Sequence, residues 1–115
     1  MIKMTRKEVY DILNAMHPTY WLAQPQGECK KPYFVIKYKN KTLSTGNGKA
    51  GWLYIDVMVY VPMASISPMD GIINEVKSAL SGKLEPTGNE TPDYLDTDVK
   101  AYMRSVEFRA PQEII

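Results

Sequence analysis

The sequence is poor in the residues that most often carry out chemistry, because its 115 residues include one cysteine and one histidine. With Cys29 alone, an intramolecular disulfide and a zinc site built from the cysteines of one chain are excluded, and a reducing compartment is expected. No apolar run approaches the ~20 residues that a membrane span needs, and we expect no signal peptide at the N-terminus. The formal net charge is +1, so no overall field favours nucleic acid or a membrane.

Candidate catalytic residues lack the context that catalysis requires. His17 precedes Pro18 at the expected end of a helix, where capping or a surface position explains it better than general-base chemistry. Lys30 and Lys31 stand beside Cys29 and would lower the pKa of its thiol, but no orienting context for a Cys-His pair is visible. The cysteine is therefore interpreted as incidental.

Candidate ligand-binding motifs are incomplete as well. The run Thr-Gly-Asn-Gly-Lys at residues 45–49 resembles a phosphate-binding loop only superficially, because its spacing is wrong and it leads into a strand. A calcium-binding loop would need a central glycine and a terminal glutamate, which are missing around Asp93, Asp96 and Asp98. We therefore expect no catalytic residue, no metal and no cofactor, and a protein that is not an enzyme.

The most informative stretch runs from Gly51 to Pro62. Aliphatic residues at every second position predict a long strand with one apolar face, made of Leu53, Ile55, Val57, Val59 and Val61. Pro62 ends this strand because proline donates no ladder hydrogen bond. Its other face has the aromatic and methionine content of an interface and consists of Trp52, Tyr54, Asp56, Met58 and Tyr60. The alternative, that a helix of the same chain covers this face, stays equally open.

Two amphipathic helices accompany the strand. Thr5 and Glu8 have the spacing of a capping box, and the apolar residues behind them predict a helix over residues 5–16 that ends before Pro18. A second helix is predicted over residues 68–81, because proline follows an N-cap serine at its start and Gly82 ends it. Its apolar stripe consists of Met69, Ile72, Ile73, Val76 and Leu80.

Shorter strands complete the expected fold. Residues 19–23, between prolines, predict an edge strand, and residues 33–38 and 98–110 predict two more, the last beside the long central one. A short strand at 83–85 precedes a turn-rich run at 86–93. This order predicts one α+β domain over residues 1–115, with an antiparallel or mixed sheet of about four strands and two main helices packed on it.

Charge is distributed unevenly along the chain. Between Glu28 and Asp56 there are no acids but six lysines, namely Lys30, Lys31, Lys37, Lys39, Lys41 and Lys49. After Val61, the sequence contains nine acids and five bases. Separated basic and acidic regions fit either a ligand site or a subunit whose basic side meets the acidic side of the next copy. The loop at 39–51 is far longer than an ordinary hairpin loop, which is typical of a functional or mobile segment.

With this order of elements, the chain resembles the tail-terminator proteins (tail-completion or head-tail joining proteins) of long-tailed bacteriophages and prophages. The resemblance rests on the N-terminal helix, the lysine-rich loop before a strand ending Val-Tyr-Val-Pro62, the helix from Met69 to Leu80, and the closing run from Arg104 to Pro111. It implies a homohexameric ring that caps the tail tube and joins it to the head connector. Its location would be the virion tail, and the host cytoplasm during assembly.

The resemblance implies surfaces rather than an active site. The expected partners are other copies of the chain, the tail tube protein and the head connector protein, with no membrane and no nucleic acid. The expected interface residues are Trp52, Tyr54, Met58, Tyr60, Lys39, Lys41 and Lys49. The alternatives are another neck or minor tail structural protein, or a small nucleic-acid-binding domain that uses the lysine-rich loop at 37–49.

Overall fold

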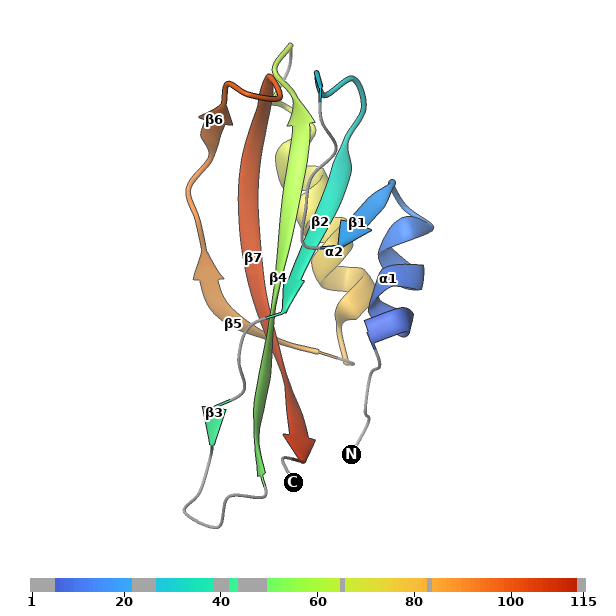
Figure 1. Ribbon diagram of the computed structural model, residues 1–115, viewed down its shortest axis with the longest axis vertical. Helices are drawn as coiled ribbons and strands as arrows, with labels where there is room; N and C mark the ends of the chain where they lie inside the picture. Colours follow the sequence, from blue (N-terminus) through green and yellow to red (C-terminus); the bar gives the residue numbers. More distant parts are fainter. Residues whose placement is uncertain are drawn as a thin grey trace.

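In the computed structural model, the chain forms one twisted sheet with two helices packed on one of its faces (Figure 1). The structure describes residues 6–21, 27–38, 42–43, 50–64, 66–82 and 84–113. Within these residues the elements are α1 (Arg6–Asn14), β1 (Thr19–Trp21), β2 (Tyr33–Tyr38), β3 (Thr42–Leu43), β4 (Ala50–Pro62), α2 (Met69–Leu80), β5 (Glu85–Glu90), β6 (Tyr94–Asp96) and β7 (Ala101–Glu113). The predicted α+β class is confirmed.

Strand β4 lies at the centre of the sheet, as its alternating pattern indicated. The strand order is β1-β2-β4-β7-β5, with β3 paired to β4 and β6 paired to β7. The pair of β1 and β2 is parallel, and the other described pairs are antiparallel, so the sheet is mixed. The predicted size was too small, because the described part of the chain forms seven strands rather than about four.

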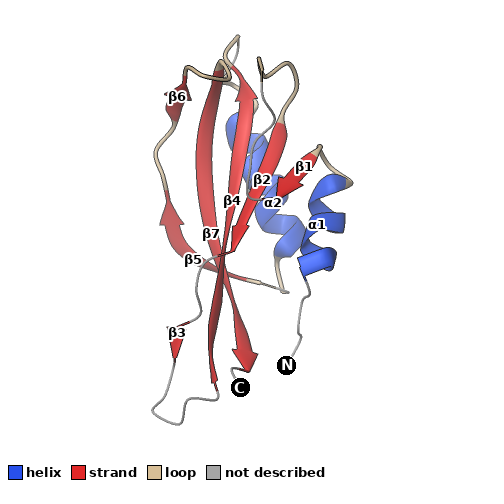
Figure 2. Ribbon diagram, in the orientation of Figure 1, coloured by secondary structure: helices blue, strands red, loops and turns tan. Residues whose placement is uncertain are grey.

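The main core lies between the helices and one face of the sheet. Four predicted apolar-face residues of β4 are buried there, namely Ile55, Val57, Val59 and Val61. From the other side α1 contributes Val9 and Leu13, and α2 contributes its whole predicted stripe. Each such side chain stabilises the fold by about 1.5–3 kcal/mol when buried. Apolar burial therefore fixes both helices, drawn in blue in Figure 2, on the same side of the sheet.

The helix boundaries agree with prediction to within two residues. Helix α1 spans Arg6–Asn14 rather than 5–16, and Thr5 of the predicted capping box lies outside the described residues. Helix α2 spans Met69–Leu80 rather than 68–81. Pro68 has helical angles of φ −73° and ψ −10° and accepts a hydrogen bond from the N–H of Ile72. Gly82 has φ +77°, the left-handed conformation that ends a helix.

The segment after α2 is more extended than predicted. Of the strand expected at 83–85, residue 83 lies outside the described residues, Leu84 is a bend and Glu85 begins β5. The run at 86–93, expected to form turns, contains most of β5, and β6 was not predicted. An edge strand tolerates Pro86, and Gly88, with φ +86°, lies within the irregular register of β5 against β7. The turn-forming residues thus make an irregular edge strand, and the last strand begins three residues later than the predicted 98, at Ala101.

The sheet face opposite the helices, which we call the outer face, carries a second and smaller core at one end. Cys29 and Val99 lie over residues of β2, β4 and β7, and the buried set comprises Cys29, Tyr33, Val35, Tyr60, Val99, Ala101 and Met103. The N–H of Cys29 donates to the carbonyl oxygen of Val99 at 2.7 Å. The segments 27–31 and 96–100 therefore meet over the sheet, and we call them together the clasp. An ion pair at 3.6 Å between Glu28 and Lys100 is a second link.

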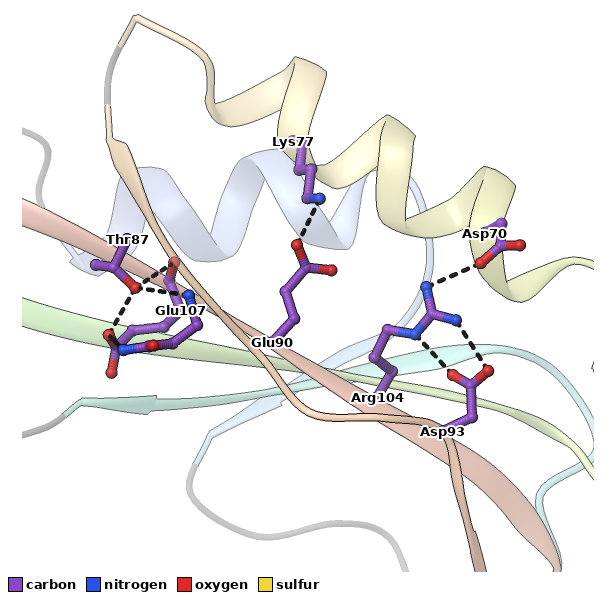
Figure 3. A network of polar contacts seen from close by, with 8 residues as sticks. Asp70, Lys77, Thr87, Glu90, Asp93, Arg104 and Glu107 are labelled. Atoms are coloured by element: carbon purple, nitrogen blue, oxygen red, sulfur yellow. Dashed lines mark hydrogen bonds and ion pairs between the residues drawn. The ribbon is translucent and has the colours of Figure 1, made fainter.

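Ion pairs fasten α2 to the edge formed by β5 and β6 (Figure 3). The guanidinium of Arg104 lies 2.6 Å from a carboxylate oxygen of Asp93 and 2.8 Å from one of Asp70. Lys77 pairs with Glu90 at 2.7 Å. These acids raise the pKa of Arg104 further, mainly through the hydrogen bonds with Asp93, so the guanidinium stays charged.

Replacing Arg104 with Met is expected to loosen the 90–96 segment. The Met side chain keeps apolar volume but leaves Asp93 and Asp70 without their cation, and partly exposed pairs of this kind contribute about 1–2 kcal/mol together. The rate of backbone hydrogen exchange, measured by mass spectrometry, should rise in residues 90–96, while residues 72–80 of α2 stay protected. Lys77→Met, which removes only the pair with Glu90, is the control with the smaller effect. Unchanged exchange in 90–96 would contradict this role.

Candidate functional site

The structure separates the residues that were predicted to form one interface. Tyr60 is only 5% exposed and lies beneath the clasp. Its ring stacks on that of Tyr33, with centroids 4.8 Å apart and planes 11° from parallel. In the free chain Tyr60 is therefore not exposed, and its place in an interface stays a prediction. The alternation placed it correctly on the outer face, but loop and turn residues of the same chain cover it, which a strand pattern does not reveal.

The other predicted interface residues have different positions. Tyr54 and Met58 are half-buried on the outer face of β4. Trp52 lies in β4 opposite Pro111 of β7 and Thr42 of β3, and its side chain is not described. The lysines predicted to join them, Lys39, Lys41 and Lys49, fall outside the described residues, as does the run at 45–49.

The middle of the outer face is polar. Lys37, Asp56 and Glu107 lie directly opposite one another on β2, β4 and β7. Glu107 is 8% exposed, and its Oε1 accepts hydrogen bonds from Thr87 Oγ1 at 2.6 Å and from Asn89 Nδ2 at 2.9 Å (Figure 3). A buried carboxylate requires such donors, so β5 makes this arrangement possible. Sequence reasoning missed it because β5 was expected to be turns.

Exposed aromatic rings gather at the edge strand β1 rather than along β4. Trp21 stacks between Tyr10 of α1 and Tyr38 of β2, with centroid distances of 5.5 and 5.4 Å. Tyr20 meets Tyr33 of the outer face edge-on at 5.7 Å. Both Tyr20 and Trp21 remain 38% exposed. The sequence predicted the edge strand and gave these rings no role, although adjacent aromatics on a short edge strand were a usable signal.

Some acids in the C-terminal half of the chain pair with bases of the same half. Arg109 pairs with Glu85 at 2.9 Å, in addition to the Arg104 and Lys77 pairs with the same edge. These pairs lie within the acidic half itself, so its excess of acids over bases is unchanged. By contrast, Lys30, Lys31 and Lys37 are exposed and make no ion pair with any residue that the structure describes. Unpaired positive charge therefore lies near β1 and β2.

A hollow of about 280 Å³ lies between β1 and the clasp, and Tyr20, Cys29 and Tyr33 are among the residues that line it. Burial raises the pKa of the Cys29 thiol, which donates to the carbonyl oxygen of Lys31 at 3.3 Å. The lowering expected from the neighbouring lysines is thus overturned, and a reactive thiolate is disfavoured. No group of acidic, histidine or cysteine side chains able to hold a metal ion was found within the described ranges.

The remaining candidate residue, His17, packs edge-on against Phe34 with centroids 5.5 Å apart, a structural position at the end of α1. None of the helices in the part of the chain that the structure describes has the length and apolar character needed to cross a membrane. A scan against protein-family models and a search of curated protein sequences found no match to this chain. The functional conclusion therefore depends on the surfaces described above.

Tyr60→Ser is expected to lower the free energy of unfolding by about 3 kcal/mol or more, because it removes a stacked ring from the smaller core. Tyr54→Ser removes a half-buried ring of the same strand face and should cost about 1 kcal/mol. Urea denaturation followed by circular dichroism measures both. Equal effects of the two substitutions would show that the clasp does not bury Tyr60.

Alkaline pH is expected to destabilise the chain partly through Tyr60. Burial, together with Asp96 and Tyr94, raises the pKa of Tyr60 to about 12, whereas an unfolded tyrosine titrates near pH ~10. The folded state therefore holds this proton more tightly, and the free energy of unfolding falls as pH rises from about 10 to about 12. Tyr60→Phe should make that fall shallower in urea titrations at several pH values. Tyr10→Phe, on α1 and therefore on the other side of the sheet from Tyr60, serves as the control and should leave it unchanged.

Proposed function

We propose that this chain is a non-enzymatic assembly protein of the tail-terminator type, which caps a phage tail tube as a ring and joins the tail to the head connector. Its partners would be further copies of itself, the tube protein and the connector protein. It would act in the virion tail after assembly in the host cytoplasm. The support comes from the shape of the sheet and from the surfaces that the helices leave uncovered.

The observation that carries the proposal is the projection of β4 and β7 beyond the helical layer (Figure 1). Each strand has 13 residues, which corresponds to about 43 Å. Helix α2 has 12 residues, which corresponds to about 18 Å. The molecule is elongated as a result, with extents of 50 × 23 × 23 Å. At the projecting end, β4 and β7 have only the two-residue strand β3 beside them. So few strands without a covering layer are only marginally stable in water, so this end favours a partner surface such as a neighbouring subunit or a tube.

The two edges of the sheet also suit a ring. A ring is built from contacts in which one patch meets a different patch on the next copy. Tyr20 and Trp21 are exposed at the β1 edge, and Tyr94 and Leu95 of β6 are exposed towards the opposite edge. Successive copies thus have two different apolar patches available for contact.

A small nucleic-acid-binding domain is the second candidate, because Lys30, Lys31 and Lys37 carry surplus positive charge. Sequence-tolerant binding of single strands uses aromatic faces on which bases stack. Here both faces of the Trp21 ring lie against Tyr10 and Tyr38, so bases cannot stack on this ring. No arginine lies between Arg6 and Arg104, so the lysine region lacks the residue most used for phosphate recognition. The assembly role accounts for more of the observed surfaces.

Electron microscopy and native mass spectrometry of the purified protein test the ring. The proposal predicts a closed ring whose population increases with protein concentration, and rings at the ends of tail tubes assembled from the tube protein of the same phage or prophage. A chain that stays monomeric and does not bind such tubes would refute it. Retention on an oligonucleotide that falls steeply with salt would favour the second candidate instead.

The lysine-rich loop provides a second test. Replacing Lys39, Lys41 and Lys49 with Gln should weaken binding to tail tubes by about tenfold, because surface charges that steer association are removed while the paired strands stay unchanged. Sedimentation of the protein with tubes measures this, and circular dichroism checks the fold. Lys7→Gln, on the exposed side of α1, is the control and should bind as the unmodified chain does. Full binding by the triple variant would remove the loop from the proposed contact.

A further inference from the structure

Apart from Tyr20, the hollow between β1 and the clasp combines features that the proposed function does not use. Its lining includes Tyr20, Tyr33, Lys30 and Lys31, with Pro18 and Pro32 as apolar walls. Its volume of about 280 Å³ is of the size that accepts one or two side chains and is near the lower limit of small-molecule sites. The exposed ring of Tyr20 lies beside it, next to the exposed Trp21.

Tyr33 supplies an independent observation. It is 5% exposed, and its hydroxyl is buried and makes no hydrogen bond with any residue that the structure describes. Buried hydroxyl groups are normally paired, because an unpaired one loses its hydrogen bonds to water without replacement. Burial also raises the pKa of Tyr33, and the nearby Cys29 adds to this, so the hydroxyl keeps its proton and stays a hydrogen-bond donor.

The charges around the hollow indicate which kind of hydrogen-bond acceptor would bind there. Lys30 and Lys31 are exposed and have no ion-pair partner among the described residues, and the charge of Glu28 is offset by Lys100 at 3.6 Å. Asp96 is close enough to raise the pKa of Tyr33, and it opposes an incoming anion. The two lysines outweigh it, so an anionic hydrogen-bond acceptor is favoured.

We propose that this hollow docks an acidic segment of a partner protein, with one carboxylate pairing with Lys30 and Lys31 and, as rim side chains move aside, accepting a hydrogen bond from the buried Tyr33 hydroxyl, while an apolar neighbour packs on Tyr20. A different protein is the proposed occupant, because Glu85, Glu90 and Asp93 of this chain already pair with Arg109, Lys77 and Arg104. Tyrosine and tryptophan at the rim are typical of protein interfaces. This inference does not depend on ring formation.

Fluorescence anisotropy with a short labelled peptide of alternating glutamate and leucine tests the proposal. The unmodified chain should bind it, and an otherwise identical glutamine and leucine peptide should bind at least about tenfold more weakly, since charge-assisted hydrogen bonds are lost. Lys30→Gln together with Lys31→Gln should weaken binding of the acidic peptide by a similar factor. Lys7→Gln is the charge control and should have no effect.

Tyr33→Phe is the decisive variant because it removes only the hydroxyl. It should weaken binding of the acidic peptide about fivefold to tenfold, and the melting temperature of the free chain should be unchanged or higher, because an unpaired buried group is lost. Tyr94→Phe, which removes an exposed hydroxyl from β6, should change neither quantity. A lower melting temperature with unchanged binding would show that the hydroxyl is purely structural and would overturn the proposal.

Three further outcomes would also overturn it. These are no binding of the acidic peptide, equal binding of the glutamine peptide, and tighter lysine-dependent binding of a single-stranded oligonucleotide than of the acidic peptide. Peptide binding by a chain that neither forms rings nor attaches to tail tubes would refute the proposed function and leave this inference standing. Rings that form normally while the peptide fails to bind would refute this inference and leave the proposed function standing.

Discussion

The antiparallel pairing of β4 with β7 is the constraint on which the rest of the structure depends. The ladder runs without a register shift from Ala50 opposite Glu113 to Pro62 opposite Ala101. One end of this ribbon carries the helices and therefore the main core, and the other end extends past them (Figure 1). Because a few strands without a covering layer are only marginally stable, the covered end stabilises the domain, while the uncovered end has only the short strand β3 beside it.

The two faces of the sheet are covered by different means. Helices cover the apolar face through a broad contact of aliphatic side chains. On the outer face the clasp covers only one end, through Cys29 and Val99, and the middle stays polar around Glu107. The clasp covers tyrosines and a methionine of the sheet with two short segments, and a hollow remains between it and β1. The same feature that removes Tyr60 from the surface thus creates the lysine-rimmed site beside Tyr20.

Electrostatics distinguishes these regions further. The acids of β5 and of the turn after it are held by bases on α2 and β7, so they fasten the edge of the sheet to the helical layer. The lysines near β1 and β2 have no such partners among the described residues. Attraction of an anionic partner is therefore expected at one side of the molecule, while apolar contacts are available at both edges.

The sequence by itself determined the α+β class, the central strand with its apolar face, the stripe of α2 and the edge position of β1. Each of these follows from local periodicity and from proline and glycine, which act within a few residues. It did not determine β5, whose turn-forming residues become a strand only because β7 offers an edge to pair with. Nor could it determine the burial of Tyr60 or the pairing of the acids with the bases. Those depend on contacts between segments far apart in the chain, such as Cys29 with Val99, and only the tertiary structure brings such segments together.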